Sequence, residues 1–169
     1  MTCFHHYRFA LPIAWVMSMA ACGGSNPPAP TAAASVEGEA IARLGNISVR
    51  ASVIQTLMLN PAVARQYGIA RDDGTILLLV AVRQGTDANE HSLPAQITAS
   101  ATDLRGHKQT IAMREVRTGD PGSAPQQALI DYVGTAQTAL PETLRFDVKA
   151  VRDGRAIATL KFNREFYPR

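Results

Sequence analysis

Few residues of this 169-residue sequence have the types and spacing that catalysis or metal binding requires. Both cysteines, Cys3 and Cys22, lie in the first 22 residues, so the rest of the chain offers no thiol for a disulfide, a zinc site or a nucleophile. The later histidines, His91 and His107, belong to no HxH, HxxxH or HExxH pattern. There is no GxSxG motif and no glycine-rich phosphate-binding loop. The sequence therefore predicts no metal, no cofactor and no catalytic residue, and it favours a non-enzymatic protein.

Two charged clusters are the remaining groups that could bind a ligand. The first contains Arg114 and Glu115 in the segment REVRTGD, and the second contains Arg164 and Tyr167 in the segment NREFY. Their functional interpretation is a small polar recognition patch, with Tyr67 as a further member. Their structural interpretation is a ladder of exposed cross-strand charges, each worth about 0.2–1 kcal/mol. We favour the structural interpretation.

Cys22 itself has a spacing that suits lipid attachment. It follows Met19, Ala20 and Ala21, and this segment resembles the lipobox of bacterial lipoproteins, although a leucine is usual where Met19 stands. In a lipobox, small residues fit the signal peptidase pocket, and the thiol accepts a diacylglyceryl group before the chain is cut. A plain secretory signal with an incidental cysteine and an uncleaved anchor are the alternatives. Gly23 stands where an aspartate would favour the inner membrane, so we expect the outer membrane.

The residues before Cys22 have the layout of a signal peptide. Residues 1–8 carry the α-amino group, one arginine and no acid, and residues 9–21 form an uncharged apolar run. That run is shorter than the roughly 20 apolar residues of a transmembrane helix. We therefore expect residues 1–21 to be a lipoprotein signal peptide and the mature protein to lie on the periplasmic face of the outer membrane. The soluble periplasm is the alternative location.

The segment after Cys22 is rich in small residues and proline. Residues 22–44 have a composition that offers little to pack on, which predicts a flexible tether. Within it, the segment VEGEAIARL, residues 36–44, has the composition of a short helix that would be marginal alone. The folded domain is expected over residues 45–169.

The charge of the chain argues against nucleic-acid binding. The formal net charge is +3 at pH 7, and removal of residues 1–21 takes away Arg8 and leaves +2. Lysines and arginines are scattered among acids and form no basic stripe that could neutralise several phosphates. The expected partners are the membrane, through the lipid, and an unknown protein or small ligand.

Period-two alternation dominates from residue 45 onward and predicts β-strands. The expected strands cover about residues 47–53, 76–82, 97–102, 107–113, 127–134, 144–150 and 156–162. One short helix is expected over residues 61–67, because Asn60 can cap it and Pro61 suits its first turn. The apolar run at residues 76–82 predicts a central strand. The fold class is therefore all-β, an immunoglobulin-like antiparallel β-sandwich of about seven strands with one short helix, and a barrel is the alternative.

The last two strands allow a prediction of register. A two-residue turn at Asp153 and Gly154 would leave the apolar faces out of line, whereas a three-residue loop over 152–154 aligns them. We therefore expect Phe146 to pair with Leu160.

Five segments share their order and spacing with a known bacterial family. They are LNPAVARQYGIAR, ILLLVAVR, TDLRGHKQTIAMREVRTGD, LRFDV and KFNREFY. Together, over residues 46–168, they resemble the domain-of-unknown-function family DUF4426. This resemblance implies a short secreted or lipid-anchored protein, and it transfers no activity, cofactor or site residue. Two insertion-like segments, residues 85–94 and 119–126, depart from the family pattern and are expected to be loops.

These observations predict a lipid-anchored β-sandwich that acts as a non-enzymatic binding or accessory module of the cell envelope. An envelope enzyme with a site built from the loops 85–94 and 119–126 is the first alternative. A structural subunit of an envelope complex, bound through free strand edges, is the second.

Overall fold

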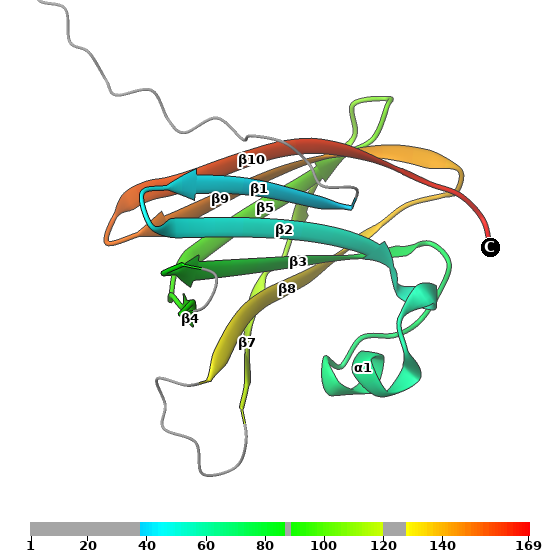
Figure 1. Cartoon of the computed structure of the whole chain (residues 1–169). Helices are drawn as coiled ribbons and strands as arrows, with labels where there is room; N and C mark the ends of the chain where they lie inside the picture. Colours follow the sequence, from blue (N-terminus) through cyan, green and yellow to red (C-terminus); the bar gives the residue numbers. More distant parts are fainter. Residues whose placement is uncertain (1–37, 87–88, 120–127) are drawn as a thin grey trace, which may run out of the picture.

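The computed structural model describes residues 38–86, 89–119 and 128–169 (Figure 1). The expected signal peptide, Cys22 and most of the expected tether lie outside the described residues. Among the described residues, no helix is long and apolar enough to cross a membrane.

Ten strands in the described part of the chain form two antiparallel sheets that pack face to face (Figure 1). The large sheet has the order β1-β2-β3-β8-β7, with β4 on β3, and the small sheet has the order β10-β9-β5-β6. The large sheet contains β1 (Glu39–Leu44), β2 (Ile47–Gln55), β3 (Thr75–Gln84), β4 (His91–Ser92), β7 (Arg114–Thr118) and β8 (Leu129–Gln137). The small sheet contains β5 (Gln96–Thr102), β6 (Lys108–Ile111), β9 (Glu142–Arg152) and β10 (Arg155–Phe166).

The core lies between the two sheets and is filled by alternate residues of each strand. On β9, Phe146 and Val148 are buried, whereas Arg145 before them and Lys149 after them are exposed. Phe146 stacks on Phe162 of β10, with ring centroids 5.2 Å apart. This arrangement of two packed antiparallel sheets confirms the predicted all-β sandwich.

Three strands exceed the expected number of about seven, and they are β1, β4 and β7. The strand β1 lies in the segment predicted as tether or short helix, where it pairs with β2 and buries Ala40 and Ala42. The prediction of a tether over residues 39–44 is therefore wrong, and the domain begins at β1 rather than at residue 45. Alanine and arginine favour helices in isolation, but pairing with β2 buries the alternate alanines and decides for a strand.

The connection from β2 to β3 contains the predicted helix. A 3₁₀ turn, η1 (Thr56–Met58), precedes the helix α1 (Pro61–Gln66). The side chain of Asn60 accepts a hydrogen bond of 2.8 Å from the amide of Ala62, as an N-cap residue does. The strand β3 pairs with β2 on one side and β8 on the other, which confirms the predicted central strand.

The hairpin of β9 and β10 has a register that differs from the prediction. Asp153 and Gly154 both have positive φ, 49° and 74°, and form a two-residue turn of the kind that Asp-Gly favours. A β-bulge between Ala156 and Ala158 then shifts the pairing, so that Phe146 faces Phe162 rather than Leu160. The bulge brings the apolar faces into line, which the prediction assigned to a longer loop.

The chain crosses from the small sheet to the large sheet between β6 and β7. Beside this crossing, the side chain of Gln109 on β6 exchanges two hydrogen bonds with the backbone of Gln137 on β8, at 2.7 and 2.9 Å. A Cβ added to Gly134 of β8 would lie only 2.8 Å from the carbonyl oxygen of Ala112. The glycine therefore allows the crossing segment to pack directly against β8.

Candidate functional site

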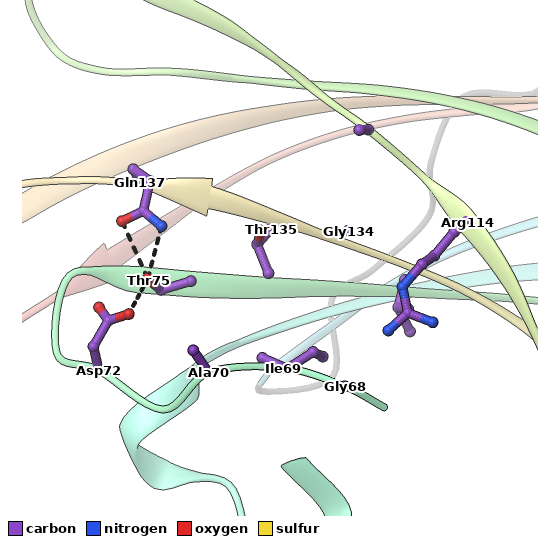
Figure 2. Close-up of a pocket in the computed structure, with 11 residues that line it drawn as sticks. Gly68, Ile69, Ala70, Asp72, Thr75, Arg114, Gly134, Thr135 and Gln137 are labelled. Atoms are coloured by element: carbon purple, nitrogen blue, oxygen red, sulfur yellow. Dashed lines mark hydrogen bonds between the residues drawn. The ribbon is translucent and has the colours of Figure 1, made fainter. Parts of the chain in front are cut away.

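The outer face of the large sheet carries a groove that lies over β8. One wall is the connection from α1 to β3, and the other is the start of β7 with the segment before it (Figure 2). The groove has a volume of about 240 Å³. Its lining residues are Gly68, Ile69, Ala70, Asp72, Thr75, Ala112, Arg114, Val133, Gly134, Thr135 and Gln137.

The end of α1 shapes the first wall of the groove. Gly68 has a φ of +60° and its amide bonds to the carbonyl of Arg65, while the amide of Ile69 bonds to the carbonyl of Ala64. A residue in the left-handed region at this position is the usual way to end a helix, and glycine adopts it without strain. The chain then turns back over the sheet and places Ile69 and Ala70 beside the groove.

A chain of hydrogen bonds fixes one end of the groove. The hydroxyl of Thr75 donates to the carboxylate of Asp72 and accepts a hydrogen bond of 2.8 Å from the amide nitrogen of Gln137 (Figure 2). Thr75 is only 4% exposed, so its hydroxyl is held between two fixed partners. The backbone of Asp72 is held as well, because its carbonyl accepts from the amide of Leu57 at 3.1 Å. Asp72 is an exposed residue whose carboxylate is nevertheless held in place by these hydrogen bonds.

Arg114 lies at the opposite end of the groove (Figure 2). Its guanidinium is 4.0 Å from the position that a Cβ of Gly68 would occupy, so it reaches across to the end of α1. Within the described residues, the ion pairs and side-chain hydrogen bonds of the protein do not include this guanidinium. The groove thus has at one end a positive charge that no described residue pairs with, and at the other end a carboxylate.

The structure separates the two residues of the first predicted cluster. Arg114 pairs with Val133 and points to the outer face, whereas Glu115 pairs with Tyr132 and points to the inner side. Glu115 forms an ion pair with Arg117, with 2.7 Å between Oε1 and Nε, and its other oxygen accepts a hydrogen bond of 3.3 Å from the hydroxyl of Tyr132. Only Arg114 of this cluster therefore belongs to the groove.

The second predicted cluster lies away from the groove. The strand β10 is the edge of the small sheet and contacts β1 and β2, while β7 is the far edge of the large sheet. Arg164 stacks over the ring of Phe162 at 5.2 Å, and the hydroxyl of Tyr167 donates to Glu165 at 2.6 Å. This hydrogen bond to Glu165 raises the pKa of the Tyr167 hydroxyl. Arg164 and Tyr167 thus interact with their neighbours on β10 and do not form one patch with Arg114.

The first of the two loops that the sequence offers as an enzyme site packs on the large sheet. In the first loop, Glu90 forms a 2.7 Å ion pair with Arg50 and Leu93 is buried, so these residues pack on the sheet. Residues 87–88 of that loop and residues 120–127 of the second loop lie outside the described residues. In the described ranges, no three His, Cys, Asp or Glu residues are placed so that they could hold a metal ion.

Asp72, Thr75 and Gln137 are functional candidates that the sequence reasoning missed. Arg71, Asp72 and Asp73 precede Gly74 and have the composition of a turn, which explains an aspartate without any ligand. Gln137 comes 62 residues after Thr75 and meets it only because β3 and β8 pair, with Thr75 opposite Gln137. No local pattern could have indicated this contact.

Comparisons with known proteins agree with the resemblance found in the sequence. A family model described as "Domain of unknown function (DUF4426)" matches residues 41–169. Among solved structures, the chain is similar to a DUF4426 family protein from Pseudomonas aeruginosa PAO1, with 26% sequence identity and a TM-score of 0.57. The match covers 80% of this chain and 99% of that chain. No curated protein matches the sequence.

Proposed function

The chain belongs to the DUF4426 family, and from that premise we propose that it is a lipid-anchored, non-enzymatic binding module of the bacterial cell envelope. The groove over β8 is the proposed binding site, and Cys22 is the proposed point of lipid attachment. The anchor would hold the domain on the periplasmic face of the outer membrane.

The groove is the observation that carries the binding role. It joins apolar side chains, Ile69 of its wall and Val133 of its floor, to polar groups at both ends. Sites for small ligands are concave and combine apolar walls with a few positioned polar groups. Its lining has no histidine, cysteine or lysine, and the one fixed hydroxyl, that of Thr75, is buried. This composition favours binding over covalent or acid–base catalysis.

The sequence around Cys22 supports the lipid anchor. Because β1 begins at Glu39, residues 23–38 lie between the proposed anchor and the first strand. A lipoprotein carries more than one acyl chain, which stable membrane attachment requires. We expect radiolabelled palmitate to enter the native protein and to be lost in Cys22→Ser. Absence of label in the native protein contradicts the anchor.

A variant that fills the groove tests the binding role. Thr135 is exposed on β8 and lines the groove, so Thr135→Trp blocks it without opening the core. The matched control is Thr98→Trp, because Thr98 is an exposed threonine on β5 of the other sheet. In a strain that lacks the gene, we expect the control to restore the wild-type phenotype and Thr135→Trp to fail, with both proteins folded and anchored. Full restoration by Thr135→Trp would show that the groove has no role.

A further inference from the structure

We infer that the groove takes a small zwitterion, with the ligand's carboxylate against Arg114 and its ammonium group against Asp72. The chemical class is that of a free amino acid or a dipeptide. This inference rests on the proposed binding function and adds to it the kind of ligand.

The positive end of the groove is built to receive an anion. The guanidinium of Arg114 has five N–H donors in a planar fork that matches the two oxygens of a carboxylate. No described carboxylate forms an ion pair with it, although the neighbouring Arg117 on the same strand is paired with Glu115 at 2.7 Å. The strand therefore carries one satisfied arginine and one that remains available, and the available one lines the groove.

The negative end of the groove is positioned before any ligand binds. The buried hydroxyl of Thr75 occupies one carboxylate oxygen of Asp72, and Gln137 in turn holds that hydroxyl. The other oxygen, Oδ1, has no hydrogen bond from the described residues and lies beside the turn, 3.8 Å from the position of a Cβ on Gly74, and Asp72 lines the groove. A carboxylate held in this way can accept from an ammonium group with little loss of side-chain entropy.

The size and the middle of the groove limit the ligand. A volume of about 240 Å³ corresponds to about eight water molecules at roughly 30 Å³ each, and it lies below the roughly 300–1,000 Å³ of sites for drug-sized molecules. Between the charged ends lie Ile69, Ala70 and the hydroxyl of Thr135, as Figure 2 shows. The groove therefore has a positive end, a short middle with apolar groups and a hydroxyl, and a negative end. This arrangement is complementary to a compact molecule with one charge of each sign.

The test is calorimetric titration of the full chain, purified from membranes, with L-alanine, L-leucine and L-alanyl-L-leucine. The N-acetylated and the C-amidated forms of each probe serve as matched ligands, since each lacks one charge. We expect at least one free zwitterion to bind, and either modification to weaken its binding about tenfold, because each removes a hydrogen-bonded charge.

Two variants assign each end of the ligand to its residue. Arg114→Gln should lose the preference for the free carboxylate and keep the preference for the free amine, and Asp72→Asn should do the opposite. Arg43→Gln, an exposed position on β1 at the other edge of the same sheet, should change neither preference.

Three results overturn the inference: no zwitterion binds, modified probes bind as well as free ones, or Arg114→Gln and Asp72→Asn leave both preferences intact. These failures are separable from failure of the proposed function. If zwitterions do not bind but Thr135→Trp still fails to restore the phenotype, the groove functions with another ligand class. If Thr135→Trp restores the phenotype as well, both proposals are wrong.

Discussion

Tyr132 shows how one side chain connects the two sheets of this protein. It lies on β8 of the large sheet, and its hydroxyl accepts a hydrogen bond of 2.8 Å from the amide of Ala95, just before β5 of the small sheet. Tyr132 is 5% exposed. Burial raises the pKa of its hydroxyl, the hydrogen bond from Ala95 lowers it, and the charge of Glu115 raises it further, with a net increase above 10.0.

The raised pKa of Tyr132 gives a prediction for stability at high pH. Below pH 10 the tyrosine is neutral in both the folded and the unfolded state, so its full contribution to the free energy of unfolding is present. Above pH 10 the unfolded tyrosine ionises first, so stability is lost as the pH rises towards the folded pKa. We expect Tyr132→Phe to lower the free energy of unfolding by about 1 kcal/mol at pH 7, and this difference to shrink above pH 10. Urea unfolding of both proteins from pH 7 to 11 measures it, and a constant difference would contradict this role.

At the scale of the elements, the alternation of apolar and polar residues predicted most strands. It failed for strands whose residue composition is not typical of a strand. The strands with regular apolar alternation, such as β2 and β9, are found where the sequence placed them. The edge strands β1 and β7 were missed, because β1 is built from residues that favour helices and β7, REVRT, is mostly charged. Both are strands because their neighbours β2 and β8 offer unpaired backbone groups, which is a tertiary effect.

Of the site residues, only Arg114 could be predicted from its own segment, as a charged residue. Asp72, Thr75 and Gln137 could not, because they meet through the pairing of strands far apart in the sequence. The bulge in the last hairpin was missed because no local pattern indicates it. Without a bulge, a two-residue turn leaves the apolar faces out of line, so the alternation favoured a three-residue loop; the bulge between Ala156 and Ala158 restores the alignment after the two-residue turn.

A substitution in β1 distinguishes a strand from a tether. Ala42 is 2% exposed and faces the core, so Ala42→Glu should bury a charge and lower the free energy of unfolding by several kcal/mol. Arg43→Glu, its exposed neighbour, should change it by less than about 0.5 kcal/mol. Chemical denaturation of the two variants makes the comparison. Equal stabilities would show that residues 39–44 are a tether after all.

At the scale of the whole molecule, the two faces of the sandwich differ in what they offer a ligand. On the outer face of the small sheet, polar and charged side chains such as Lys108 and Arg145 line a hollow of about 450 Å³. There Lys161 is already paired with Asp147 at 3.1 Å. The large sheet instead carries a smaller groove with an apolar floor and one charge at each end, beside the connection from α1 to β3 (Figure 2). The outer face of the large sheet is therefore the face on which we propose that the ligand binds.

The groove over β8 is the place where we expect this protein to bind its ligand, and amide chemical shifts measured by NMR test that location most directly. On titration of the labelled full chain with L-alanyl-L-leucine, the amides of Gly68, Thr135 and Gln137 should shift. The amides of Thr98 and Thr159, on the small sheet, should not. Shifts that gather on the small sheet and spare the groove would contradict the proposed site.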